Sequence, residues 1–486
     1  MSFMWVFLGF FFILMTSYFS FYFGLDFFFL QFFFFLSPQV TMFLSMLMLV
    51  FLIIIFFSFF YMNGYYFYSF FLVLILIFLL VMMLFLISSS NHLIYFSWDL
   101  LGVSSFFLVI YYLTWVSISG GLITILSNRW GDFFLMLWTL MNTYFMEENL
   151  IFSFFLNWVL ILTSSTKSAQ VPFHGWLPKA MEAPTPVSAL VHSSTLVTSG
   201  LLLSMSFMSE SADLIELMSF LTGFMSLFFS SFLAVVESDA KQLVAWSTLS
   251  QVALANLFFS VGYTYYCFMH LISHAFFKSL LFLQIGFFIN MNMGEQDMRK
   301  SQTLNLFQFF NLSLVSSWFS LASLYFTGGM LSKDIFFEML FEGYLSFFVS
   351  LIFLMGASMT FFYLMKMYSL FSSISVLLKM TFSWWSLIGF FLIFLSLFFI
   401  MFMLTNFMPI PLVSGFYLYF WVIFLFSCSF FYLVYNFFKS TVNFYFLANY
   451  FFFFFLGFFS SLMGLESSLL KTNILMINYN WKGVVI

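Results

Sequence analysis

Long apolar runs, separated by short polar connections, cover nearly the whole chain of 486 residues. An α-helix of about 20 residues spans the roughly 30 Å of hydrocarbon in a bilayer. The pattern therefore predicts an all-α polytopic membrane protein with about 14–16 transmembrane helices. Their expected positions are 3–23, 41–61, 66–89, 92–113, 121–146, 149–171, 187–207, 213–236, 241–261, 264–291, 303–326, 330–342, 345–370, 385–407, 414–437 and 444–464.

Two places along these runs carry residues that interrupt helices. The first, 172–186, holds four of the seven prolines, namely Pro172, Pro178, Pro184 and Pro186. The second, 327–334, reads TGGMLSKD. Matching interruptions in two halves of a chain are typical of transporters built from inverted repeats. We therefore expect broken helices near Pro184–Pro186 and near Gly328–Gly329, both at membrane depth.

Composition narrows the class further. With 64% hydrophobic and 6% charged residues and a mean hydropathy of +1.11, the chain has too little polar surface for a soluble domain. A net charge of −4 without a basic stripe argues against a nucleic-acid partner. The first run, 3–23, lacks a basic flank and a small-residue cleavage site, so we interpret it as a retained helix rather than a signal peptide.

Sites for redox or nucleotide chemistry are not evident in the sequence. Cys267 and Cys428 lie in separate apolar runs and form neither a disulfide framework nor a metal-binding spacing. We find no phosphate loop, nucleophile elbow, haem pair or iron–sulfur cysteine run. The expected chemistry is therefore that of protons or cations.

A few ionisable residues lie within apolar runs, where a charge costs at least about 2.5–3.5 kcal/mol on insertion scales. Asp99 lies in WDLLGVSSFF, and Lys167 immediately precedes the first interruption. Separately, they could be an acid at a helix N-terminus and a snorkelling lysine. Together they could form a buried pair in which the carboxylate holds the lysine protonated and separation releases the proton.

The segment HLISHAFFKSLLF places His270, His274 and Lys278 at positions i, i+4 and i+8. This spacing stacks the three side chains on one helix face. Two histidines at i and i+4 could bind a metal, but the glutamate of an HExxH motif and a third ligand are missing. A structural hydrogen-bonded pair is a second interpretation. We favour a proton relay, because histidine titrates near neutral pH.

Other charged residues lie near the interruptions or at the ends of runs. Lys333 follows the second interruption, as Lys167 precedes the first. Arg129 and Asp132 are spaced i and i+3, and Asp239 precedes the run that begins at 241. For each of these residues a local salt bridge at a helix end explains the charge almost as well as a functional role.

The segment at 167–200, KSAQVPFHGWLPKAMEAPTPVSALVHSSTLVTSG, closely resembles the antiporter-like membrane subunits of respiratory complex I. The motifs WDLLGVSSFF, NRWGD, DAKQLVAWSTLSQ, HLISHAFFKSLLFL and GGMLSKD follow in the order of that family. The resemblance implies a proton-translocating membrane-arm subunit of NADH:ubiquinone oxidoreductase. Multi-subunit antiporters share this architecture, so a stand-alone secondary cation/proton antiporter is the alternative. A structural scaffold with vestigial charges is disfavoured, because the set of charged residues is complete.

The resemblance also implies residue roles. The proton relay would consist of Asp99, Lys167, His192, Lys241, His270, His274, Lys278 and Lys333. The auxiliary charged residues would be Arg129, Asp132, Asp239 and Asp334. Asp99 takes the place of an acid that pairs with Lys167, although many family members have Glu there. We expect Asp99 and Lys167 to pair directly or through one water, and the relay to form a band parallel to the membrane.

The same resemblance predicts organisation and surroundings. We expect N-terminal transmembrane helices at 1–90, an antiporter-like proton-translocating core at 91–370, and C-terminal transmembrane helices at 371–443. Residues 444–486 would be a shortened C-terminal segment, either a remnant of a lateral helix or a final span. No cofactor is expected in this chain. NADH, FMN, iron–sulfur clusters and ubiquinone belong to partner subunits. Expected partners are other membrane-arm subunits, especially chain 4, and lipids, in the mitochondrial inner membrane.

Overall fold

The computed structural model describes residues 21–27, 30–144, 150–207, 213–292, 294–299, 317–323, 329, 332–333 and 347–372. Its contacts divide the chain into the units Met1–Leu425 and Phe426–Ile486. The helices expected at 385–407, 414–437 and 444–464 lie outside the described residues, as do most of those at 303–326 and 330–342. The predicted total of helices and the four-part organisation therefore stay predictions.

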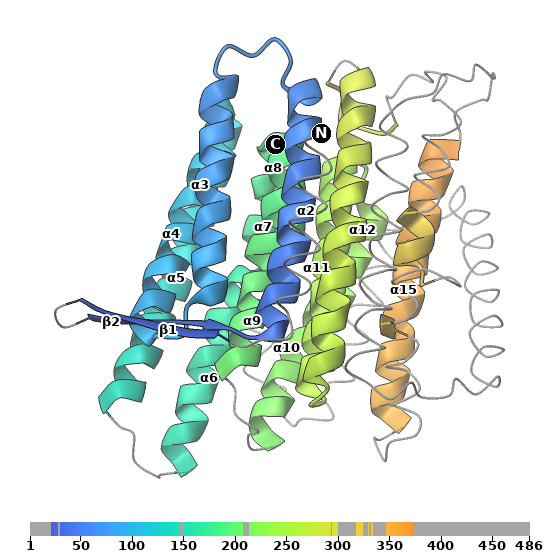
Figure 1. The fold of residues 1–486 in the computed structure, drawn as a ribbon. Helices are drawn as coiled ribbons and strands as arrows, with labels where there is room; N and C mark the ends of the chain where they lie inside the picture. The colour runs from blue at the N-terminus through green and yellow to red at the C-terminus, as the bar shows by residue number, and fades with distance from the viewer. Residues whose placement is uncertain are drawn as a thin grey trace. The chain divides into compact units, whose positions relative to one another are not determined.

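The described part of the chain is a bundle of long helices, which confirms the expected all-α membrane class (Figure 1). Ten long helices or helix segments coincide with ten predicted spans, in the same order. They are α2 (Pro38–Tyr61), α3 (Tyr68–Ile87), α4 (Asn91–Val109), α5 (Trp115–Tyr144), α6 (Leu150–Lys167), α9 (Leu196–Phe207), α10 (Asp213–Val236), α11 (Ala240–Ser260), α12 (Thr264–Met291) and α15 (Phe347–Ser372). Within the described ranges, seven helical stretches are long and apolar enough to cross a membrane.

The expectation of a helix at 3–23 is wrong at its C-terminal end. Strand β1 (Phe21–Phe27) pairs antiparallel with β2 (Leu30–Leu36), with Phe21 opposite Leu36 and Phe27 opposite Leu30. Residues 1–20 lie outside the described part. Gly24 and Asp26 are poor helix formers, and aromatic residues favour strands, so the apolar run alone did not distinguish the two structures.

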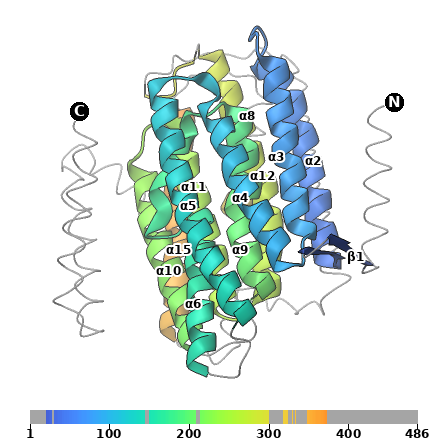
Figure 2. The ribbon, with the colours of Figure 1, turned by 90° about the vertical axis from the view of Figure 1, so that its left-hand side faces the viewer.

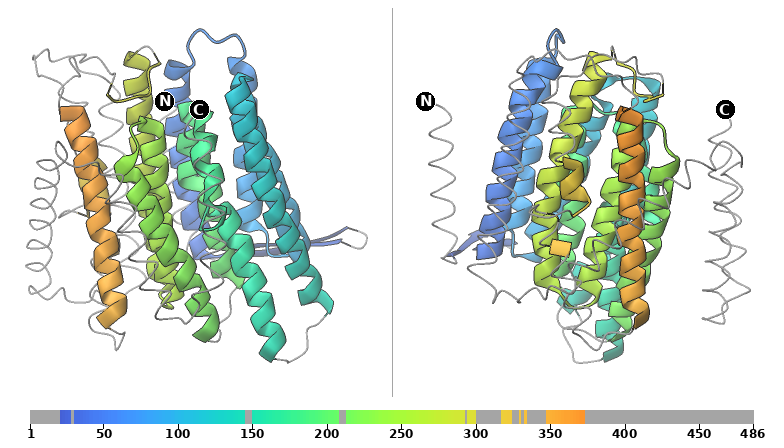
Figure 3. Two further views of the ribbon diagram at one scale, coloured as in Figure 1. Left: turned by 180° about the vertical axis from the view of Figure 1, so that it is seen from behind. Right: turned by 90° about the vertical axis from the view of Figure 1, so that its right-hand side faces the viewer.

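Helices α11 and α12 form the centre of the bundle, and their apolar windows are completely buried (Figures 2 and 3). Short turns connect α10 to α11 and α11 to α12, so these neighbours run antiparallel. By contrast, less than half of the window of α3 is buried within the bundle. The polar and ionisable residues of α11 and α12 are therefore surrounded by protein.

The first interruption begins where α6 ends at Lys167. Ala169 has a left-handed backbone, with φ of 55°. The backbone amide of Gln170 donates to the Ser165 carbonyl at 3.0 Å, which closes the helix in the manner of a Schellman motif. A short helix α7 (Trp176–Lys179) follows within the interruption. The break therefore occupies 168–184.

Helical structure resumes with α8 (Thr185–Val187), which starts directly after the extended Pro184. Pro186 lies in the first turn of α8, where a missing amide proton has little cost. The chain then passes through a π-helical segment, Ser188–Thr195, into α9. The break expected near Pro184–Pro186 is present, and these prolines mark its end.

The second interruption has a similar start. A helical segment ends at Leu321, and Ser323, two residues later, has a left-handed backbone with φ of 56°. Ala169 has the same conformation two residues after the end of α6. Gly329 is helical again, and a Cβ there would lie 1.9 Å from the Ser320 carbonyl oxygen, so the position requires glycine. The helix thus ends several residues before the glycine pair. Gly328 lies outside the described residues, and the depth of both breaks in a membrane stays a prediction.

Close packing of α5 against α6 depends on Gly131. A Cβ at this position would lie 2.2 Å from the Thr166 hydroxyl oxygen. That hydroxyl donates to the Thr163 carbonyl at 2.7 Å, so it cannot turn away without losing a buried hydrogen bond. Gly131 adjoins Asp132, and Thr166 adjoins Lys167, so this contact sets the separation of two charged residues.

Gly131→Ala should push α5 away from α6. We expect it to lower the stability of the folded protein by about 1–3 kcal/mol, the usual cost of overpacking a tight contact. The matched control is Gly175→Ala, because a Cβ at Gly175 has no atom within 4 Å and its φ of −68° suits alanine. Thermal unfolding of the two purified variants measures the difference, and equal melting temperatures would contradict the packing argument.

Candidate functional site

Lys167 lies at the last position of α6 and is fully buried. Its Nζ donates to the backbone carbonyl oxygen of Trp98 on α4 at 2.6 Å. The same Nζ lies 3.8 Å from the centroid of the Trp98 ring, a cation–π contact. Trp98 therefore binds this ammonium group through both its backbone and its side chain.

A cluster of three charged side chains lies beside Lys167. Arg129 contacts Asp99 at 2.8 Å and Asp132 at 3.4 Å, so one guanidinium bridges α4 and α5. Arg129 and Asp99 are partly exposed at the bundle surface, whereas Asp132 is buried. Both carboxylates are near enough to attract the Lys167 ammonium.

In this arrangement Asp99 and Lys167 do not pair directly, and pairing through one water stays a prediction. The ion-pair partner of Asp99 is Arg129, and the hydrogen-bond partner of Lys167 is the Trp98 carbonyl. Asp99 directly follows Trp98, so the backbone of this α4 turn serves the lysine while the Asp99 side chain points to α5. The sequence thus predicted correctly that α4 and α6 meet at these residues, but it did not predict which atoms are in contact.

Two further relay residues adjoin the first interruption. Lys241, in the first turn of α11, is buried and donates through Nζ to the Ala183 carbonyl at 3.1 Å, at the end of the break. His192 lies in the π-helical segment, fully buried, with its ring 6.0 Å from that of Trp176. Neither ring nitrogen of His192 has a hydrogen-bond partner among the described residues. Asp239 immediately precedes α11.

The predicted face of α12 is present, and all three of its residues are fully buried. The Nδ1 of His270 lies 3.1 Å from the Ser332 hydroxyl, and the rings of His270 and His274 are 6.4 Å apart. Lys278 donates through Nζ to the Ser247 hydroxyl of α11 at 2.7 Å. Eight residues of helix correspond to about 12 Å, so this part of the set runs along α12.

Lys333 lies at the second interruption, as expected, and is buried. Its Nζ donates to the carbonyl oxygen of Leu321 at 2.8 Å, at the end of the preceding helical segment. The neighbouring Ser332 contacts His270, so the second break adjoins the α12 face directly. Asp334 lies outside the described residues.

A common feature links the four buried lysines. Lys167, Lys241 and Lys333 each donate to a backbone carbonyl, and Lys278 donates to a hydroxyl. In the part of the chain with described coordinates, Lys167, Lys241 and Lys278 do not lie within salt-bridge distance of a carboxylate. Neutral oxygens solvate an ammonium without fixing its proton as firmly as an anion does.

Several contributing residues were not predicted, because their own chemistry is unremarkable. Trp98 and Ser332 each adjoin a predicted residue, so the motifs WD and SK contained a signal for them. Ser247 lies in DAKQLVAWSTLSQ but is one of many serines. Within the described ranges, three or more His, Cys, Asp or Glu residues do not gather where they could hold a metal ion. The alignment of the relay in a band parallel to the membrane stays a prediction.

Solved structures with a similar fold belong to membrane complexes. A chain of the Mrp complex from Dietzia sp. DQ12-45-1b superposes with a TM-score of 0.73 at 18% identity, over 97% of this chain and 59% of that one. A chain of the membrane-bound sulfane sulfur reductase, an archaeal respiratory complex, gives a TM-score of 0.70 at 17% identity, over 83% and 73%. At these identities the likeness concerns the fold alone.

Sequence relatives are more specific. NADH-ubiquinone oxidoreductase chain 5 of Ascaris suum is 45% identical over 273 residues, which are 55% of this chain and 50% of the relative. The chain 5 proteins of Caenorhabditis elegans and Apis mellifera ligustica are 44% and 36% identical over 57% and 60% of this chain, and 53% of each relative. The chain thus matches about half the length of these curated relatives.

The match to a protein family covers the candidate site. Residues 88–360 match the family described as NADH:quinone oxidoreductase/Mrp antiporter, TM. This range is more than half of the chain, and it contains both interruptions, the charged cluster of α4 and α5, and every predicted relay residue. The protein therefore belongs to the NADH:quinone oxidoreductase/Mrp antiporter family of membrane subunits.

Proposed function

We propose that this chain is a proton-translocating membrane-arm subunit of NADH:ubiquinone oxidoreductase in the mitochondrial inner membrane. Electron transfer, with NADH, FMN, iron–sulfur clusters and ubiquinone, takes place in partner subunits, among them chain 4 as a membrane neighbour. This chain contributes proton movement. The similarity to chain 5 relatives supports the assignment, and the buried lysines supply the chemistry.

The observation that carries the proposal is the setting of the four lysines. An ammonium in an apolar interior needs a hydrogen-bond acceptor, and each of the four has one in a neutral oxygen. Among the described residues, Lys167, Lys241 and Lys278 have no carboxylate at salt-bridge distance, so each of these ammonium groups can give up its proton at a smaller electrostatic cost than in a close ion pair. Such lysines suit repeated protonation and deprotonation.

The charged cluster of α4 and α5 is suited to control Lys167. Arg129 contacts both Asp99 and Asp132 and offsets one of their two negative charges, and both carboxylates also attract Lys167. If Arg129 turned away at the partly exposed surface, the carboxylates would act on Lys167 alone and favour its protonated form. Return of Arg129 would favour proton release. The cluster therefore couples a surface movement to a buried proton.

Along α12, the histidines provide the steps between lysines. His270 reaches Ser332 beside Lys333, and Lys278 reaches Ser247 of α11. His274 lies between them on the same face. The ring nitrogens of His192 and His274 have no hydrogen-bond partner among the described residues, so they are natural binding points for water, which normally satisfies buried polar atoms. Lys241 and Lys333 then stand at the two interruptions.

A stand-alone secondary cation/proton antiporter is the second candidate, favoured by the structural similarity to a chain of an Mrp complex. The two candidates predict different partner proteins. A pump subunit should co-purify with a large NADH-oxidising assembly, whereas an antiporter should co-purify only with small membrane partners. Native electrophoresis with an NADH-oxidation stain distinguishes them.

Replacement of Lys167 tests the proposed chemistry. Lys167→Met keeps the length of the side chain but removes the titratable group, so proton translocation per NADH oxidised should fall by about tenfold or more, a barrier increase of about 1.4 kcal/mol. Lys179→Met is the control, since Lys179 is exposed in the same stretch. Proton uptake in vesicles gives the readout, with assembly measured in parallel. Normal translocation by Lys167→Met would refute the role of Lys167.

The charge of Asp99 should matter more than its length. Asp99→Glu keeps the carboxylate and can still reach Arg129, so most translocation should remain. Asp99→Asn leaves Arg129 with Asp132 as its only carboxylate in this cluster, and translocation should fall severalfold. The same vesicle assay compares the two variants. Equal activity of Asp99→Asn and the parent chain would exclude an electrostatic role for this position.

A further inference from the structure

We propose that Tyr363 of α15 is a positioning residue for the α12 face, which consists of His270, His274 and Lys278. Tyr363 acts through α11, the helix that contacts both α15 and α12. This inference rests on the proposed function, because it gives α15 a part in the control of the same relay.

Tyr363 joins α15 to α11 through a polar contact in the interior of the bundle. Its side chain is fully buried, and its phenolic oxygen accepts a hydrogen bond from the Nε2 of Gln251 at 3.0 Å. The Ser250 side chain lies near the same oxygen. Buried tyrosine hydroxyls normally have such partners, because an unpaired one is costly. One turn of α11 therefore fixes the position of Tyr363, and Tyr363 fixes the position of that turn.

One face of α11 contacts the relay residues of α12. Ser247, Gln251 and Phe258 are spaced i, i+4 and i+11, so they lie within about 40° of one another around the helix axis. We refer to these three residues as the α11 face. Ser247 accepts the hydrogen bond of the Lys278 Nζ at 2.7 Å, and the backbone carbonyl of Gln251 lies near the His270 ring. A shift of this face would change the surroundings of a histidine and a lysine together.

An aromatic contact repeats this arrangement two turns further along α11. The Phe258 ring meets the His270 ring edge to face, with centroids 5.4 Å apart, and it stacks on Phe353 of α15 at 6.0 Å. Phe353 is fully buried. Because Phe353 contacts Phe258 and Tyr363 contacts Gln251, α15 runs antiparallel to α11 here. The helix α15 thus supports the surroundings of His270 at two heights, once by ring packing and once by a hydrogen bond.

The α12 face needs such support because proton transfer depends closely on distance. A proton passes between heavy atoms that are about 2.6–3.2 Å apart, or through one water. The Nδ1 of His270 lies 3.1 Å from the Ser332 hydroxyl, next to Lys333, so this contact is near the upper limit of that range. A misplacement of about 1 Å can lower a rate roughly 100-fold. Small displacements of the α11 face would therefore be sufficient to affect the relay.

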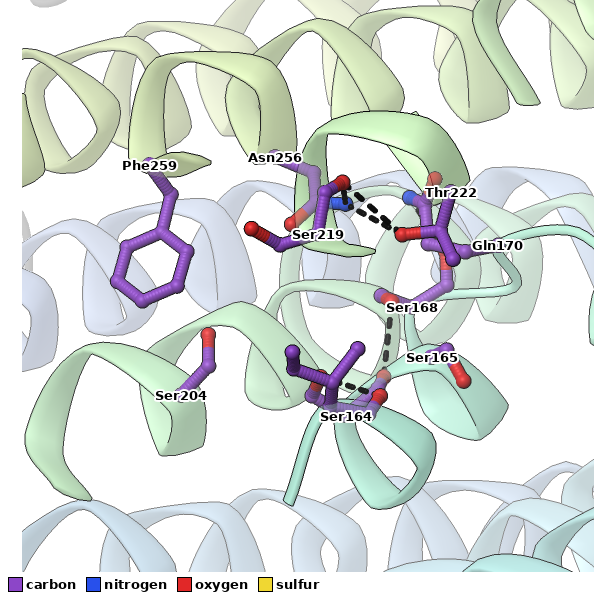
Figure 4. Close-up of a pocket in the computed structure, with 10 residues that line it drawn as sticks. Ser164, Ser165, Ser168, Gln170, Ser204, Ser219, Thr222, Asn256 and Phe259 are labelled. Carbon is purple, nitrogen blue, oxygen red and sulfur yellow. Dashed lines mark hydrogen bonds between the residues drawn. The ribbon is translucent and has the colours of Figure 1, made fainter. Parts of the chain in front are cut away.

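On its opposite side, α11 has an anchor that does not touch the α12 face. The Nδ2 of Asn256 donates to the Ser219 carbonyl of α10 at 3.2 Å and to the Thr222 hydroxyl at 3.4 Å (Figure 4). Asn256 follows Ser247 by nine residues, which places it about 180° away around the helix axis. This buried amide holds α11 against α10, and it provides a natural comparison for Gln251.

A purely structural role would explain the polar pair less well. The Oε1 of Gln251 has no hydrogen-bond partner in the part of the chain that the structure describes, and a buried unpaired oxygen lowers stability. Apolar side chains would hold α15 against α11 without this cost. The position of the pair, on the α11 face beside His270, accounts for a hydroxyl and an amide at this place.

Removal of one hydroxyl tests the proposal. Tyr363→Phe, in the full chain within its membrane assembly, keeps the ring and removes only the hydrogen-bonding oxygen. Proton translocation per NADH oxidised should fall severalfold in vesicles that contain equal amounts of assembled complex. Thr360→Val is the control on the same helix, since the buried Thr360 hydroxyl donates to the Ala357 carbonyl of α15 itself at 2.7 Å. Translocation equal to that of the parent chain in Tyr363→Phe would overturn the proposal.

A double variant separates positioning from stability. Tyr363→Phe leaves the Nε2 of Gln251 unpaired, so the melting temperature should also fall. Tyr363→Phe combined with Gln251→Met removes both partners, and the melting temperature should return towards that of the parent chain. Translocation should stay low in the double variant, because the contact that positions the α11 face is still missing. Recovery of translocation together with the melting temperature would show a structural contact only and overturn the proposal. Should Tyr363→Phe alone fail to assemble, the double variant provides the same test.

Asn256→Leu is the matched control for the loss of an amide contact on α11. It should lower the melting temperature and leave translocation per NADH unchanged, since Asn256 lies on the other side of the helix. An equal loss of translocation in Asn256→Leu would mean that any weakened contact of α11 has this effect, and the proposal would fail.

The result for Lys167 distinguishes this inference from the proposed function. Impaired translocation by Lys167→Met together with normal translocation by Tyr363→Phe would overturn the role of Tyr363 alone. Normal translocation by Lys167→Met would contradict the proposed function itself, whatever Tyr363→Phe does.

Discussion

The architecture depends on keeping ammonium groups inside a bundle that has almost no polar material. In such an interior, an unsolvated charge is excluded and a backbone carbonyl is the most abundant available acceptor. Interrupted helices supply carbonyls that no amide within the helix uses. Lys241 uses one at Ala183, and Lys333 uses one at Leu321. The breaks are therefore part of the lysine sites.

The same constraint explains why the interruptions resemble each other. Each helical segment closes with a left-handed residue, Ala169 or Ser323, two positions after its last helical residue. That conformation is unfavourable for residues other than glycine by roughly 1–2 kcal/mol. A neighbouring segment then packs very closely, with Gly200 against α6 and Gly329 against Ser320. Tight packing of this kind keeps freed backbone groups away from lipid.

The sequence predicted most reliably those features that depend on a single helix face or a single apolar run. Ten spans, the first break and the i, i+4, i+8 face of α12 follow from local periodicity and from proline positions. The helix predicted at 3–23 is wrong at residues 21–23, which belong to β1, since an apolar aromatic run suits a strand as well as a helix. A direct contact between Asp99 and Lys167 is absent, because a sequence shows that two charges need partners but not which atoms are nearest.

The sequence by itself determined that this protein is a membrane bundle, where its helices are interrupted and which residues carry titratable groups, because these properties depend on local composition and spacing. Only the tertiary structure decided that Arg129, rather than Lys167, binds Asp99 directly, and that each of the four lysines donates a hydrogen bond to a neutral oxygen. These features depend on distances of a few ångströms between segments far apart in the chain, and packing alone sets such distances.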